Sequence, residues 1–193
     1  TEFHSLREYQ RGDDIRRINW KASARATGLI VRETALEGIR RCTVVLDTDA
    51  SEYSGDSFEH AVIAAASVTS SAAHTGVNTR FVTHDVDLRG PDVAANTLRW
   101  LAMVEPVTEV TELASMNSGM SEGMGLVVIV TGSSNSAAVG ELRSAVGQDE
   151  TLVVVCATKY AASTRFIVDG TSTESLIASW SHLIVGSTQA VHS

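Results

Sequence analysis

The stretch R-C-T-V-V-L-D at residues 41–47 is rich in β-branched residues and ends in an acid. Such a run predicts a strand that is buried on both faces. An Ala-rich helical stretch to His74 follows it, and apolar runs at residues 126–130 and 151–157 alternate with further helical patterns. Alternating strands and helices predict βαβ units with right-handed crossovers. We therefore expect a doubly wound, mostly parallel α/β sheet with helices on both faces.

The residues upstream of this strand predict two further features. Residues 29–34 alternate between apolar and polar side chains, which indicates a strand that pairs with residues 41–47 as an antiparallel β-hairpin. Residues 1–27 are polar, rich in Arg and Asp, and show little periodicity. We expect a polar basic arm over residues 1–27 that packs on the domain, followed by the α/β domain over residues 28–193.

The composition predicts a soluble domain with an aliphatic core. Of the 193 residues, 44% are hydrophobic and 5% are aromatic, so Val, Ile, Leu and Ala must fill the core. Cys42 and Cys156 lie in or beside Val-rich runs, which favours buried thiols and a reducing compartment. No run approaches the ~20 apolar residues that cross a bilayer, so we expect membrane attachment only through segments outside this chain.

Charge is distributed unevenly along the chain. Residues 1–41 carry nine basic and six acidic side chains, whereas the whole chain has a formal net charge of −8. Residues 42–193 therefore carry a net charge of −11. This acidic body argues against nucleic-acid binding, and the basic arm suits docking on its own domain or on an acidic partner.

The end of the strand at residues 41–47 carries the first candidate site. Asp47, Asp49 and Ser51 present oxygen side chains at alternate positions after the strand, where ligands of such sheets bind. This spacing suits a hard cation such as a weakly held Mg²⁺. In the structural alternative, Asp47 caps the following loop and the other two side chains are solvated. After residues 126–130, Thr131-Gly132 offers no carboxylate to complete a metal site.

Motifs for catalysis are absent from the sequence. No glycine-rich nucleotide motif follows a strand, no G-x-S-x-G nucleophile elbow occurs, and the six His residues form no ligand pair at i, i+4. We therefore expect no enzymatic activity.

A dense block near the start of the chain carries the second candidate site. Arg and Asp side chains there can form bidentate ion pairs, and two aromatics supply apolar anchors with polar tips. The block either fastens the arm to its own domain or forms a docking surface for a partner. Its candidate residues are Arg7, Tyr9, Arg11, Asp13, Asp14, Arg17, Trp20 and Lys21.

This block resembles a known family. F-H-S-L-R-E-Y-Q-R-G-D-D-I-R-R-I-N-W-K-A-S-A-R at residues 3–25, then L-I-V-R-E at 29–33 and V-V-L-D-T-D-A-S at 44–51, resemble the bacterial domain of unknown function fifty-eight. Members of that family look like von Willebrand factor A domains, many of which bind Mg²⁺ through Asp-x-Ser-x-Ser after the first strand. Here Asp49 stands in place of the first Ser, the usual Asp is missing at Thr131-Gly132, and Asn19 replaces the family's Asp.

The resemblance implies a function in protein assembly. Members are often encoded beside AAA+ ATPases of the MoxR type, so it implies a non-catalytic protein-interaction domain that assists such an ATPase in assembly or maturation of other proteins. It places the domain in the cytoplasm or on the cytoplasmic side of the inner membrane. Two alternatives remain: a metal-dependent phosphate-ester hydrolase, with Mg²⁺ on Asp47 and Asp49 and His84 as base, and a structural scaffold of a membrane protein.

Overall fold

The computed structural model describes residues 5–9, 18–33, 39, 41–108, 125–147, 150–158 and 166–180. The chain divides into two compact units. The smaller unit comprises residues 1–37 and 184–193, and the larger unit comprises residues 38–183. Within the described part of the chain, no helix combines the length and apolar character that a membrane crossing needs.

The larger unit is built on a six-stranded sheet in the order β5-β4-β3-β6-β7-β8. Every neighbouring pair is parallel except β4 and β5. The central strand β3 pairs with β4 on one side and β6 on the other, as its apolar run predicts. The strands are β3 (Arg41–Leu46), β4 (Asn78–Val82), β5 (Asp87–Arg89), β6 (Gly125–Thr131), β7 (Glu150–Cys156) and β8 (Ile167–Asp169).

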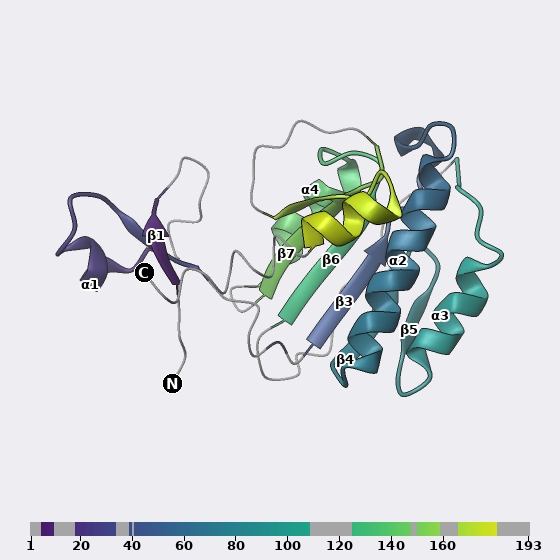
Figure 1. Ribbon diagram of the computed structural model, residues 1–193, viewed down its shortest axis with the longest axis horizontal. Coiled ribbons are helices and arrows are strands. Elements are labelled where there is room, and N and C mark those ends of the chain that lie inside the picture. Colours follow the sequence, from purple (N-terminus) through teal and green to yellow (C-terminus); the bar gives the residue numbers. More distant parts are fainter. Residues whose placement is uncertain are drawn as a thin grey trace. The chain divides into compact units, whose positions relative to one another are not determined.

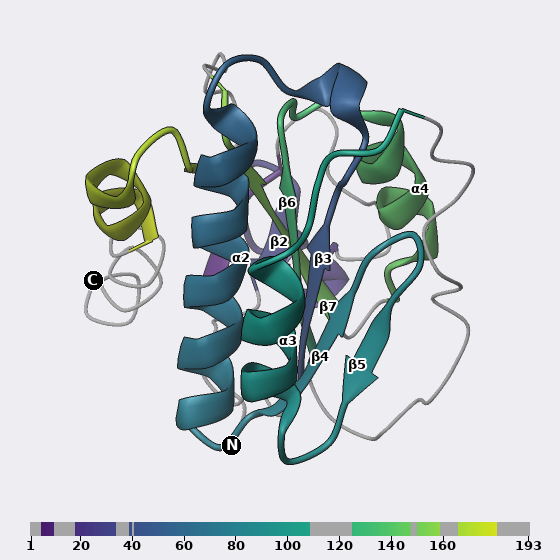
Figure 2. The same cartoon turned by 90° about the vertical axis from the view of Figure 1, so that its right-hand side faces the viewer.

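Helices cover both faces of this sheet, which confirms the predicted doubly wound α/β fold. Helices α2 (Ser57–His74) and α3 (Val93–Leu101) lie on one face, together with the helical residues 173–180 (Figure 1). Helix α4 (Ala137–Ala145) lies on the opposite face, as the edge-on view shows (Figure 2).

The core between the sheet and α4 is aliphatic. Val45 and Ile129, on neighbouring central strands, pack with Val139 and Leu142 of α4 in one buried cluster. Each such side chain contributes roughly 1.5–3 kcal/mol when it leaves water. Cys42 and Cys156 are buried free thiols, as expected, and burial raises the pKa of Cys42 to about 12.

The smaller unit corrects one prediction. Strand β2 (Ile30–Glu33) pairs antiparallel with β1 (Ser5–Glu8) and not with β3, so the predicted hairpin is wrong. Both edges of β3 are occupied by β4 and β6, which leaves no place for β2 beside it. Apolar–polar alternation marks a strand but does not identify its partner. The packing of residues 1–27 on the domain stays a prediction.

A short helix supports β2 in the smaller unit. Helix α1 (Trp20–Ser23) is capped by Asn19, whose Oδ1 accepts the Ala22 N–H at 3.1 Å. The Asn19 N–H donates to the Ile30 carbonyl at 2.7 Å, and the Ile30 N–H donates to the Ser23 hydroxyl at 2.8 Å. These bonds fix α1 against β2.

Candidate functional site

The carboxyl ends of the parallel strands bring together loops that are distant in sequence. The loop after β3 leads through a 3₁₀ turn, η2 (Ala50–Glu52), towards α2. A second segment joins it, because the Val107 N–H donates to the Thr48 carbonyl at 2.7 Å and the Ala50 N–H donates to the Val107 carbonyl at 2.8 Å. We call these loops, together with the loops after β4, β6 and β7, the carboxyl edge.

A buried carboxylate lies at the centre of this edge. Asp47 is only 2% exposed, and both oxygens of its side chain accept hydrogen bonds. Its Oδ1 accepts the Asp49 N–H at 3.1 Å, and its Oδ2 accepts the hydroxyl proton of Thr131 at 2.8 Å. Thr131, the last residue of β6, is completely buried. The bond therefore joins two neighbouring strands at the point where they end.

The same chain of hydrogen bonds reaches α4. Ser136 caps this helix, and its hydroxyl accepts the Val139 N–H at 3.3 Å. The Ser136 and Thr131 hydroxyl oxygens are 3.1 Å apart. Because the Thr131 proton goes to Asp47, Ser136 donates its own proton to Thr131. We call Asp47, Thr131 and Ser136 the Asp47 hub.

Asp49 and Ser51 take local roles beside the hub. The Asp49 Oδ1 accepts the Ser51 N–H at 2.9 Å and caps η2, while Ser51 is exposed. Among the described residues, no group of three or more His, Cys, Asp or Glu side chains could hold a metal ion. Both oxygens of Asp47 and the Oδ1 of Asp49 already accept hydrogen bonds within the chain, and metal binding at Asp47, Asp49 and Ser51 stays a prediction.

Tyr53, which directly follows η2, contacts the hub at Asp47. The Tyr53 hydroxyl donates to the Asp47 carbonyl, and the Tyr53 ring meets the edge of Phe58 with centroids 5.0 Å apart. Burial raises the pKa of Tyr53, and the charge of Asp47 adds to this shift. The pKa of Glu52 is also raised, first by burial and then by the charges of Asp47 and Asp49. Several acids are therefore close enough to repel one another here.

Gly132 permits a close approach of two loops. A Cβ at this position would lie 1.7 Å from the Glu52 carbonyl oxygen, so no side chain fits. The sequence did not lead us to expect roles for Tyr53, Gly132 or Ser136. It drew attention to Thr131 only because a carboxylate was expected at that position and none is present. A signal existed for two of them, since a Gly directly after a buried strand indicates close backbone approach and Ser is a preferred helix cap.

His84 follows β4 and contacts the edge through one nitrogen. Its Nδ1 lies 2.7 Å from the Thr48 hydroxyl and 3.6 Å from the nearer Asp85 carboxylate oxygen. In a nucleophile–base–acid triad, the imidazole uses one nitrogen for the nucleophile and the other for the acid. Here both contacts involve the same nitrogen, so these three residues do not form a triad.

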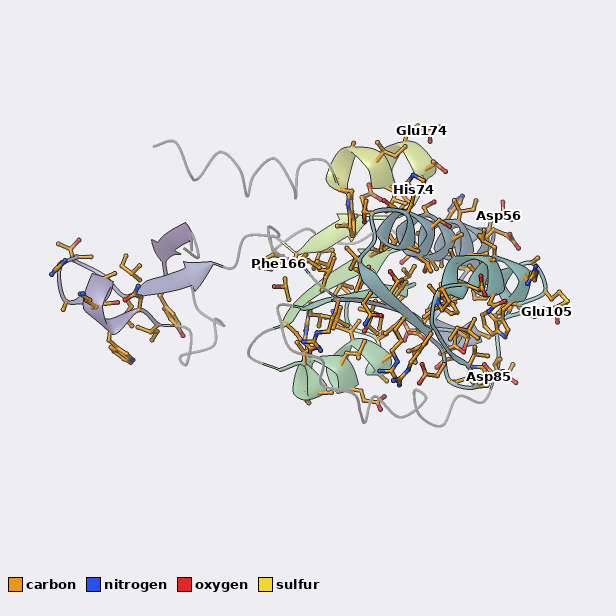
Figure 3. All side chains as sticks on the ribbon, turned by 90° about the horizontal axis from the view of Figure 1, so that it is seen from below. Asp56, His74, Asp85, Glu105, Phe166 and Glu174 are labelled. Atoms are coloured by element: carbon orange, nitrogen blue, oxygen red, sulfur yellow. The ribbon has the colours of Figure 1, made fainter. Side chains whose placement is uncertain are left out.

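The surface of the edge is acidic. Three of its described segments, residues 47–56, 83–86 and 102–108, contain no Lys or Arg. Their acids are Asp47, Asp49, Glu52, Asp56, Asp85 and Glu105. Asp56, Asp85 and Glu105 are exposed and lie at the same end of the larger unit (Figure 3). Met103, in the segment that precedes Val107, is 79% exposed and adds an apolar side chain.

The N-terminal candidate residues are only partly described. Trp20 is 67% exposed and Lys21 is exposed, both on α1. Tyr9 is half-buried, and its N–H donates to the Leu29 carbonyl at 2.7 Å. Arg7 lies in β1. Arg11, Asp13, Asp14 and Arg17 fall outside the described residues.

Comparison with known proteins identifies the family. The family model described as "Protein of unknown function DUF58" matches residues 5–159. The matched range includes β1, β2, the loop after β3 and the strands up to β7. Curated proteins give no match. Since the matched range covers most of its 193 residues, the chain belongs to the DUF58 family.

Proposed function

We propose that the chain is a non-catalytic protein-interaction domain whose carboxyl edge binds the partner. One observation carries the proposal: exposed acidic side chains from three loop segments lie at one end of the larger unit, and one of these segments also exposes Met103. An exposed Met is an adaptable contact at binding surfaces. The acidic groups of these segments favour the approach of a cationic partner segment and disfavour that of an acidic one.

The hydrogen bonds beneath this surface support the same function. Asp47 and Thr131 join two strands, and Ser136 continues the chain of bonds into α4. A surface whose loops are held in place before binding loses less conformational entropy when a partner docks. The edge is therefore suited to recognition of a partner of defined shape.

The partner class follows from the family resemblance. We propose that a MoxR-type AAA+ ATPase, or a client protein of that ATPase, presents a Lys- or Arg-rich segment to the carboxyl edge. The domain then assists assembly or maturation of other proteins, in the cytoplasm or on the cytoplasmic side of the inner membrane. A membrane is involved only through segments outside this chain.

A hydrolase receives less support from the same residues. His84 contacts the Thr48 hydroxyl through Nδ1, and Thr48 is buried. Both oxygens of Asp47 accept hydrogen bonds from the protein. A base for an attacking water needs a free position within reach of that water. No observation favours the hydrolase over the interaction domain.

Charge reversal on the exposed acids tests the proposal. A MoxR-type AAA+ ATPase would be purified, and its affinity for the chain would be measured by biolayer interferometry. We expect the double variant Asp85→Lys with Glu105→Lys to bind at least about tenfold more weakly, because it reverses the charge at two exposed positions of the carboxyl edge. Added salt should weaken the wild-type complex as well.

The matched control is Glu141→Lys, which changes the same charge on an exposed position of α4. We expect this control to bind like the wild type. Equal affinities for the edge variant and the control would place the partner elsewhere on the chain. Phosphoesterase activity that needs Mg²⁺ and disappears in Asp47→Ala would favour the hydrolase instead.

A further inference from the structure

We infer that the Asp47 hub positions the carboxyl edge through hydrogen bonds alone and that the edge needs no divalent cation. Only the statement that this edge binds a protein partner rests on the proposed function. The hub itself can be tested in the isolated full chain.

The first support is the hydrogen bonding of the carboxylate. Asp47 receives a backbone N–H on one oxygen and the Thr131 hydroxyl proton on the other. Bonds to a charged acceptor are about twice as strong as those between neutral groups. These donors do for the buried carboxylate what a cation would do, because they place positive partial charges on both oxygens.

The second support is the shortage of further ligands. Mg²⁺ takes oxygen ligands in octahedral geometry and keeps several waters. Asp47 is 2% exposed and Thr131 is fully buried, so their side chains do not face solvent that could complete a hydration shell. The next acid along the loop, Asp49, uses its Oδ1 to cap η2. This donor set supplies two carboxylates, of which three oxygens already accept hydrogen bonds from the chain, and hydroxyls, which is too few open ligands for a tightly held cation.

The third support is what the hub connects. It links the end of β3 to the end of β6 through Thr131 and to the first turn of α4 through Ser136. The Asp49 N–H, which Asp47 holds, lies where the chain turns into η2. Asp47 is thus a positioning residue for two of the loops that form the edge.

Three variants of the full chain test the positioning role. Thr131→Val removes the hydroxyl with little change of volume, and we expect the melting temperature of the larger unit to fall by about 5 °C or more. Thr131→Ser keeps the hydroxyl and should recover most of that loss. Asp47→Asn combined with Thr131→Val should lower the melting temperature by less than the sum of the two single effects.

Amide exchange distinguishes positioning from general destabilisation. In Thr131→Val we expect the Asp49 and Val139 amides to exchange at least about tenfold faster by NMR, while the Val44 amide in the centre of β3 changes only with global stability. Unchanged exchange at Asp49 and Val139, or no recovery in Thr131→Ser, would overturn the hub.

Metal titration of the wild type tests the second half of the inference. With 1 mM EDTA or about 10 mM Mg²⁺ or Mn²⁺, we expect the melting temperature to shift by less than about 1 °C. A cation held with a Kd near 0.1 mM would raise it by about 5 °C or more under the same conditions. A rise of that size that is lost in Asp47→Asn would overturn the inference, and it would leave the proposed partner binding to be judged by its own experiment.

Discussion

Asp47 and Asp87 are held in opposite ways. Asp87, on the edge strand β5, accepts two hydrogen bonds from Arg80 and two from Arg89, at 2.8–3.0 Å. Asp47 accepts hydrogen bonds from a backbone N–H and a hydroxyl. Asp87 thus has cationic partners on a partly exposed strand, whereas the donors to buried Asp47 are neutral.

The difference explains why the two regions suit different tasks. The Arg89 and Arg80 hydrogen bonds hold the pKa of Asp87 well below its usual range, so this acid is locked into a local ion-pair cluster. At the carboxyl edge, burial raises the pKa of Glu52, and the charges of Asp47 and Asp49 raise it further. Arginines neutralise the charge locally at Asp87, whereas the exposed acids of the carboxyl edge lie in segments that contain no Lys or Arg.

The largest effect is expected at the close approach beside the hub. Gly132→Ala would put a Cβ 1.7 Å from the Glu52 carbonyl oxygen, so one of the two loops must move. We expect a loss of about 3 kcal/mol or more in the free energy of unfolding, measured by urea denaturation. A loss below about 1 kcal/mol would mean that the edge is more adaptable than its hydrogen bonds indicate.

Gly140→Ala is the matched control for this substitution. Gly140 lies in α4, and a Cβ there meets nothing within 4 Å. Since Ala is a better helix former than Gly, this variant should gain up to about 1 kcal/mol. Opposite signs for the two substitutions would locate the constraint at Gly132.

A moderate effect is expected at the ion-pair cluster. Asp87→Asn weakens the bonds from Arg80 and Arg89 and should cost about 1 kcal/mol at neutral pH, because solvent screens this partly exposed group. The folded-state pKa of Asp87 lies below its unfolded value, so its stabilisation is fully present above about pH 4 and is lost as the pH falls further.

Unfolding measured between pH 2 and pH 7 checks the sign. The difference between wild type and Asp87→Asn should be constant above about pH 4 and shrink below it. Asp92→Asn is a suitable control, since Asp92 is exposed and its side chain makes no capping bond to α3. A difference that grows in acid would contradict the assignment of Asp87 as the stabilised acid.

The smallest effect is expected at Glu52. Its raised pKa means that the folded state binds the proton more tightly, so the ionised side chain destabilises the fold above the usual Glu pKa. Glu52→Gln removes that charge and should gain less than about 1 kcal/mol at pH 7. The gain should disappear as the pH falls through the range in which Glu52 becomes protonated. Glu141→Gln on α4 should show neither change.

The strands of the larger unit could be predicted from the sequence because their apolar runs are long and lie between helical patterns. The run at residues 41–47 predicted β3 and the acid that directly follows it. The runs at residues 126–130 and 151–157 predicted most of β6 and β7. The short β5 lacks such a run, since Asp87-Leu88-Arg89 has only one apolar residue. It forms because β4 offers a free edge.

The hub could be predicted only in part. The position of Asp47 follows from the rule that ligand sites gather at the carboxyl ends of parallel strands. Its bond to Thr131 spans 84 residues and depends on β3 and β6 being neighbours, which strand patterns do not specify. The contact of Gly132 with Glu52 likewise depends on loop paths that no local propensity determines.

Hydrogen–deuterium exchange of the full chain with and without the purified MoxR-type ATPase tests partner binding at the carboxyl edge most directly. We expect the partner to slow exchange in residues 48–56, 83–86 and 102–107, and to leave α1 and β2 of the smaller unit unchanged. Protection confined to residues 20–33 around the exposed Trp20 would contradict this and would make the N-terminal block the docking surface.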